Sequence, residues 1–280
     1  MILQNKIDFM GIIVAQHCNP NGDPLNNNRP REDWDGIGEI SDVCLKRKIR
    51  NRLAEMGNEI LLVSSENVTD GLYSIKARVE AEKELMKREK AKDVNGYIDY
   101  ACKKWIDVRT FGQLFAFSGV KQSSGVSICA RGPVSIGIAR SIRYVNILDM
   151  QITKSINSDD VKDNPLKKDS TTMGQKHIID HGAYVFFGGI YPHLAQKTGF
   201  SDEDAEMVKQ AMVHMFVNDA SAARPVGSMI MDKLIWWQHN SSIGQYSPKK
   251  LMESVTLTAK EKFPYYDFSI SDLPGLVPEI

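Results

Sequence analysis

The chain has 280 residues, 42% hydrophobic and 25% charged, a composition typical of a globular protein with a substantial core. Its 35 basic and 35 acidic side chains cancel, which excludes a strongly basic nucleic-acid binder and requires any basic surface to be local. The four cysteines form no Cys-x-x-Cys pair, which excludes a zinc ribbon. Because the N-terminus lacks a signal-peptide pattern and no apolar run approaches the ~18 residues of a membrane span, we expect a soluble cytoplasmic protein.

The first expected elements are a buried strand and a long loop. Residues 7–15 form a nearly continuous apolar run with β-branched members, which is typical of a strand covered on both faces. Residues 19–40 are rich in proline, glycine and asparagine and favour neither helix nor sheet, so we predict a long loop that is either functional or disordered. Within it, residues 19–24 form either an ordinary turn or a nest of backbone N–H groups for a phosphate or a neighbouring subunit.

A basic amphipathic helix follows this loop. Ser41 is a good N-cap, Gly57 is a plausible C′ residue, and an apolar stripe recurs between them at helical spacing. Residues 46–52 place five cations on this helix, and Lys46 and Arg50 are expected opposite the apolar stripe. This basic face is either a merely solvated surface or a ridge that binds phosphates.

The middle of the chain is expected to add insertions to a sheet. Residues 66–106 are dense in charges of alternating sign and predict a mainly helical, solvated insertion. Residues 126–138 alternate between apolar and polar, which predicts a strand or a strand pair bent at Gly132-Pro133. Residues 156–176 are polar and predict a surface excursion, and residues 183–191 predict a return to the sheet.

A second amphipathic helix begins at Ser201, where the following acidic residues resemble a capping box. The resulting order is strand, helix, strand, strand, helix, strand, with insertions. This order predicts an α+β fold with a ferredoxin-like core.

Catalytic and metal-binding patterns are weak. Asp33, Asp35 and Asp42 are candidates for a divalent cation that would support RNA cleavage, but no ordered scaffold is evident for their loop. His177 and His181 lack further ligands at a convincing spacing for zinc. We therefore expect no metal site and no cofactor. The Trp236-Trp237 pair is interpreted as core or intersubunit contact rather than as a platform for bases.

Eight segments, in order along the chain, resemble the Csd-type member of the Cas-seven family. They are NPNGDP (19–24), NRPR (28–31), SDVCLKRKIRN (41–51), DVRTFG (107–112), RGPVSIGIARSI (131–142), TMGQKHI (172–178), KTGFSDED (197–204) and DKLIWWQHN (232–240). Each motif is weak by itself, and together they are highly specific.

The resemblance implies an RRM-like palm, a single elaborated domain over residues 1–280, with a helical insertion at 66–106 and a thumb-like insertion at 143–178. It implies the CRISPR RNA-binding backbone subunit of a type I-C Cascade complex in antiviral defence, with no catalytic role. Several copies would polymerise along one CRISPR RNA beside other Cascade subunits and present the guide for pairing with target DNA.

The family's RNA-contacting regions, carried over by resemblance, fall on the loop, the basic helix and later segments. The implied RNA-binding residues are Asn21, Arg29, Arg31, Lys46, Lys48, Arg50, Arg109, Arg131, Met173, Lys176 and His177. Met173 is expected to wedge against a base. Two alternatives remain open: a metal-dependent ribonuclease that acts on guide-paired RNA, and a monomeric binder of short RNA.

Overall fold

A computed structural model describes residues 1–116, 128–155 and 173–280. Its centre is an antiparallel sheet in which the described strands run in the order β11 (Met229–Gln238), β1 (Ile7–Cys18), β10 (Met173–Ile190), β8 (Ala139–Tyr144) and β4 (Ile37–Ile40). β7 (Val134–Ile136) and β9 (Ile147–Thr153) also pair with β10. The mixture of helices and antiparallel sheet confirms the predicted α+β class.

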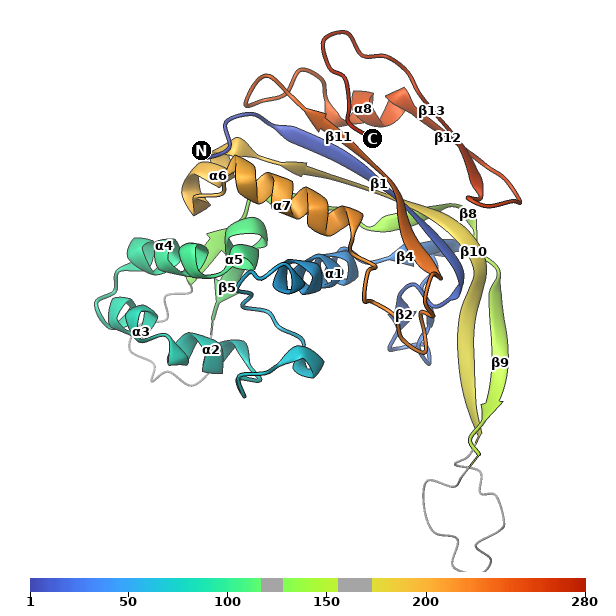
Figure 1. Ribbon diagram of the computed structural model, residues 1–280, viewed down its shortest axis with the longest axis horizontal. Helices are drawn as coiled ribbons and strands as arrows, with labels where there is room; N and C mark the ends of the chain where they lie inside the picture. The colour runs from blue at the N-terminus through green and yellow to red at the C-terminus, as the bar shows by residue number, and fades with distance from the viewer. Residues whose placement is uncertain (117–127, 156–172) are drawn as a thin grey trace, which may run out of the picture.

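Two helices cover one face of this sheet (Figure 1). They are α1 (Asp42–Glu55) and α7 (Asp202–Val213), and their apolar residues join those of β1 and β10 in the largest core cluster. Both predicted N-caps are confirmed, because Ser41 accepts a hydrogen bond from Cys44 N and Ser201 forms a capping box with Asp204. Gly57 has a φ of +87°, as expected of a C′ glycine.

The C-terminal segment covers the opposite face of the sheet. Helix α8 (Pro248–Ser254) and the hairpin of β12 (Val255–Ala259) and β13 (Tyr266–Ile270) pack there, in a second cluster with Trp237. Because adjacent residues of a strand point to opposite faces, Trp236 joins the first cluster, where it stacks on Phe9 with a centroid distance of 5.4 Å. The prediction that β1 is covered on both faces is confirmed, and of the two roles expected for the tryptophans, core or intersubunit contact, the structure shows the core.

Residues 58–116 build a helical segment beside the main core. After the 3-10 helix η1 (Ser65–Asn67) come α2 (Ile75–Ala81), α3 (Lys83–Lys90), α4 (Val94–Lys104) and α5 (Ile106–Phe111), and β5 (Gly112–Phe115) pairs with β6 (Ile128–Arg131). The expected solvated helix is divided into α2 and α3 at Glu82, whose backbone is extended. The predicted bend at Gly132-Pro133 separates β6 from β7, which pair with different strands. The short α6 (Pro192–Thr198) connects β10 to α7.

The expectation that residues 19–40 lack sheet is wrong. They contain β2 (Gly22–Asp23), β3 (Arg29–Pro30) and β4, and β4 forms the edge of the main sheet by pairing with β8. The partner of β4 is distant in sequence, so the local composition gave no sign of it.

A long two-stranded ribbon extends away from the sheet (Figure 1). It consists of β9 and the first residues of β10, paired from Ile147↔Ile179 to Thr153↔Met173. The expected surface excursion at 156–176 therefore ends in β10, while residues 156–172, the middle of the region expected to form the thumb, lie outside the described residues. Across the described ranges, no helix is long and apolar enough to span a bilayer.

Candidate nucleic-acid interface

The loop of residues 19–40 and the base of the ribbon meet at Asp149. The Arg29 guanidinium lies 2.5 Å from Asp149 Oδ1, and His177 Nδ1 lies 2.6 Å from the same oxygen. The hydrogen bond from Arg29, and then that from His177, lowers the pKa of the Asp149 carboxyl. This triad, which we call the junction, fixes the loop against β9 and β10. It brings Arg29 and His177 together, although 148 positions of sequence separate them.

The loop is also fixed to the beginning of α1. Asn21 Oδ1 accepts a hydrogen bond from Ser41 N at 2.9 Å, and the Asn21 carbonyl accepts one from Arg31 N at 3.0 Å. The Arg31 guanidinium lies 3.3 Å from Asp23. Asn21 thus holds the 19–40 loop against the start of α1, and Arg31 is a half-exposed cation within the same loop.

The cations of α1 divide into two groups. Lys46 is half-buried and pairs with Asp42 at 2.9 Å. Lys48 and Arg50 are buried: Lys48 pairs with Asp219, and Arg50 lies 3.1 Å from the buried Asp107. The expectation that Arg50 lies on the exposed side of the helix is therefore wrong. Buried ion pairs connect α1 to its neighbours at both positions, and burial lowers the pKa of Arg50.

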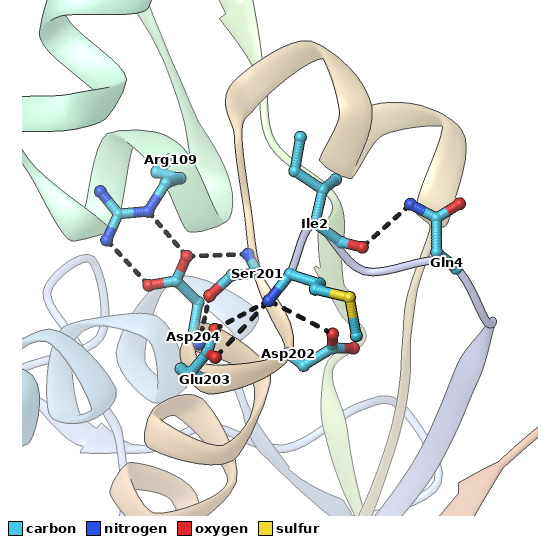
Figure 2. A network of polar contacts seen from close by, with 8 residues as sticks. Ile2, Gln4, Arg109, Ser201, Asp202, Glu203 and Asp204 are labelled. Atoms are coloured by element: carbon cyan, nitrogen blue, oxygen red, sulfur yellow. Dashed lines mark hydrogen bonds and ion pairs between the residues drawn. The ribbon is translucent and has the colours of Figure 1, made fainter.

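Arg109 serves the packing of α5 against α7 (Figure 2). Two of its guanidinium nitrogens donate to the Asp204 carboxylate, each at 2.8 Å, while Asp204 also accepts from Ser201 N in the capping box. A third nitrogen donates to the Cys102 carbonyl at 2.5 Å. Three hydrogen bonds to two structural partners, Asp204 and Cys102, thus occupy the Arg109 side chain in the free chain.

The remaining predicted residues are more accessible but do not share one surface. Met173 is 63% exposed, Arg131 is exposed, and Lys176 is half-buried. Within the described ranges, neither Arg131 nor Lys176 forms a side-chain ion pair. Met173 and His177 share one face of the ribbon while Lys176 lies on the other, and Arg131 belongs to β6, beside the helical segment.

Sequence reasoning missed the segment 217–228, which links α7 to β11. Asp219 binds both Lys48 and Arg224, the latter at 3.2 Å. The carbonyl of Ala223 accepts a hydrogen bond from Asn19 N at 2.8 Å, so this segment lies directly beside the start of the 19–40 loop. The run of small residues with Arg224-Pro225 and Gly227 between a helix and a strand was the available signal.

The candidate metal ligands serve other contacts. Asp33 Oδ1 accepts hydrogen bonds from Asp35 N and Ile37 N, both at 3.0 Å, and Asp42 pairs with Lys46. His181 contacts Asp180 and Arg143 and stacks on Tyr265. In the part of the chain that the structure covers, no three His, Cys, Asp or Glu side chains are grouped to hold a metal ion.

A cavity of about 370 Å³ lies between α1 and the helical segment, with Arg50 in its lining. Its charged lining is paired: Arg78 contacts Asp70 at 2.8 Å, and Lys104 bridges Glu59 and Glu82 at 3.1 and 3.2 Å. These pairs leave the cavity without a free charge to recognise an anion.

The fold and the site thus define a mixed α+β protein in which a loop that carries two arginines, a basic helix and the base of a ribbon are joined at one side of a sheet. A sequence model of the family described as CRISPR-associated protein Cas7 matches residues 5–272. The chain belongs to the CRISPR-associated Cas7 family, which confirms the resemblance at the level of the family.

Two known proteins show the extent of this similarity. A CRISPR-associated protein Cas7 of Haloferax volcanii is 25% identical over 242 residues, covering 81% of this chain and 68% of the relative. A chain in the solved structure of a CRISPR RNA-guided surveillance complex, pre-nicking, superposes with a TM-score of 0.50 at 14% identity, covering 83% of this chain and 78% of that one. The structural likeness establishes a shared fold.

Proposed function

We propose that this protein is the repeated backbone subunit of a type I-C Cascade complex, binding CRISPR RNA and presenting it to target DNA. The single observation that carries the proposal is the family match over residues 5–272. Further copies of this chain and other Cascade subunits are the proposed protein partners, and the cytoplasm is the proposed location. The proposed role is structural, without catalysis.

The proposed architecture is a single elaborated domain over residues 1–280 around an RRM-like palm. The order β11-β1-β10-β8, with α1 and α7 on one face, supports this palm. Residues 66–106 would form its helical insertion, and residues 143–178 its thumb. Because the C-terminal segment covers the other face, the palm is proposed to bind RNA at its edge and loops rather than by stacking bases on the sheet.

We propose that the guide's phosphates follow the part of the 19–40 loop that carries Arg29 and Arg31, and the accessible start of α1. Arg29, Arg31 and Lys46 would supply charge there, with Lys176 on the ribbon and Arg131 at a second point. Lys48, Arg50, Arg109 and His177 are proposed to act on RNA through the loops and helices that they hold in place, because their paired side chains are more deeply buried than those of Arg29, Arg31 and Lys46. Asn21 would shape the loop from its contact with Ser41.

Such contacts hold the backbone of the guide and leave its bases available for pairing. Met173, exposed at the described end of β10, is proposed to wedge against a base and to interrupt the guide–target duplex at intervals. Met173→Ala should then change the pattern of guide positions protected from nuclease, and an unchanged pattern would contradict the wedge.

The direct test of backbone binding compares several unrelated RNA sequences of equal length in a filter-binding assay. The proposal predicts closely similar affinities, because phosphates carry no sequence information. A strong preference for one sequence would overturn it and favour a binder that reads bases. An RNA with the same sequence but with neutral methylphosphonate linkages is the matched control, and it should bind far more weakly.

A further inference from the structure

Trp34 is fully exposed to solvent, with a relative accessibility of 105%. It stands at the tip of the tight turn of residues 33–36, next to the edge strand β4. Tyr144, which is 68% exposed, lies at the same edge, because it pairs with Ile37. Large aromatic side chains supply much of the energy of protein interfaces, so a fully exposed tryptophan on the sheet edge marks a contact surface.

The turn that carries Trp34 is held rigidly. Asp33 N donates to the Ile37 carbonyl at 2.9 Å, and Gly36 N donates to the Asp33 carbonyl at 3.0 Å. The Asp33 side chain accepts two further backbone N–H groups at 3.0 Å each, and Gly36 adopts a φ of +76°, which favours glycine. A rigid turn presents its aromatic side chain with little loss of conformational entropy on binding.

The charge around Trp34 selects the class of partner. Glu32, Asp33 and Asp35 surround it in sequence, and none forms an ion pair with another described residue. Three carboxylates repel the phosphates of a nucleic acid, so this tip is unsuited to RNA or DNA. The acidic tip is instead complementary to a basic protein surface.

This chain carries such a surface on α3 and the turn that follows it. Lys83, Lys87, Lys90 and Lys92 are exposed and form no ion pair within the described ranges, against one unpaired carboxylate there, Glu89. In Figure 1, α3 lies at the left end of the molecule, well separated from β4, which lies to the right of its centre. Two different surfaces of one chain that meet produce a head-to-tail contact, which repeats along a filament when its rotation does not close a ring.

We propose that the tip formed by Trp34 and its flanking carboxylates docks against the lysines of α3 in a second copy of this chain. The inference rests on the proposed function, in which copies assemble side by side on one RNA, and it names the surfaces that meet. The chain has no net charge, but its Trp34 tip is acidic and its helix α3 is basic. This separation of charge favours association of copies in one orientation.

The test measures assembly of the full chain on an RNA of defined length by native mass spectrometry across a protein titration. Trp34→Ala should raise the protein concentration for half-assembly by at least about tenfold. Its unfolding transition should match the wild type, because the side chain makes no core contact. An unchanged assembly midpoint would overturn the inference while leaving the proposed function intact.

Charge reversal provides an independent test. Glu32→Lys with Asp35→Lys should weaken assembly, as should Lys87→Glu with Lys90→Glu, and all four changes in one chain should restore it. The control Lys249→Glu with Lys250→Glu, on exposed positions of α8, should assemble normally. If the chain that carries all four substitutions does not regain assembly, the docking is overturned.

A short RNA that accommodates only one copy shows whether Trp34 contacts a second protein copy or the nucleic acid. Trp34→Ala should bind it as tightly as the wild type, and an equal loss of affinity there would show a nucleic-acid contact and overturn the inference. Wild-type protein that binds long RNA only as single copies would overturn the proposed function together with this contact.

Discussion

The guanidinium of Arg50 lies 3.1 Å from the carboxylate of Asp107, and both groups are buried. Asp107 also accepts hydrogen bonds from Leu61 N and Leu62 N, at 2.9 and 3.1 Å, and the Arg50 guanidinium lies 4.8 Å from the centre of the Phe111 ring. The pair therefore joins α1, α5 and the segment between them. A cation in the most basic stretch of the chain is thus a structural group in the free protein.

Removal of Asp107 should strongly destabilise the fold. Asp107→Ala leaves the Arg50 charge buried without a partner and is expected to lower the free energy of unfolding by about 3–5 kcal/mol. Urea denaturation measures this change. Arg52→Ala, which breaks a more accessible pair on the same helix, is the control and should cost at most about 1 kcal/mol. Equal small losses in both variants would contradict the structural role of Asp107.

The salt dependence of RNA affinity should distinguish contact residues from structural ones. Lys176→Gln and Lys46→Gln should each weaken binding to all RNA sequences alike and reduce the slope of log K against log salt by about 0.7, because each loses one phosphate contact to a single strand. Arg109→Gln breaks the contact with Asp204 and should mainly lower thermal stability, with an unchanged slope. A reduced slope for Arg109→Gln with unaltered stability would contradict this division.

The junction should respond to acid in a definite direction. Arg29, and then His177, lowers the pKa of Asp149. The pairing therefore contributes its full stabilisation of the fold above the ordinary aspartate pKa of about 3.9. This stabilisation is lost as the pH falls through the lower pKa of the folded state. Carboxyl carbon NMR should give a lower midpoint for Asp149 in the wild type than in Arg29→Gln. Arg31→Gln, which affects the contact with Asp23 instead, is the control. Equal midpoints in wild type and Arg29→Gln would contradict the junction.

A backbone subunit without catalysis should leave complementary RNA intact. Assembled protein incubated with complementary RNA and Mg²⁺ is expected to give no regularly spaced cuts on a denaturing gel. Asp33→Ala and Asp35→Ala are the decisive variants: spaced cuts that vanish in either of them would establish the ribonuclease alternative.

Local features of the fold could be predicted from the sequence. The caps of α1 and α7, the apolar run of β1 and the bend between β6 and β7 all depend on neighbouring residues, and the structure confirms them. The strands within 19–40 escaped prediction because β4 is formed by pairing with β8, about a hundred residues later. Tertiary pairing there overrides a composition that favours loops.

The candidate site was less accessible to sequence reasoning because charge type does not reveal burial. The partners of Lys48 and Arg50 lie 171 and 57 positions away, so their ion pairs follow only from the folded chain. The segment 217–228 has no strong motif, and its position beside the loop depends on the contact of Asn19 with Ala223. The role of the predicted residues in RNA binding remains a prediction.

The most direct test of the backbone role is native mass spectrometry of the protein purified from cells that also express a CRISPR array, with guide RNAs of two lengths. The account predicts several copies on one RNA, with more copies on the longer guide. A monomer without RNA, or one copy regardless of guide length, would contradict it.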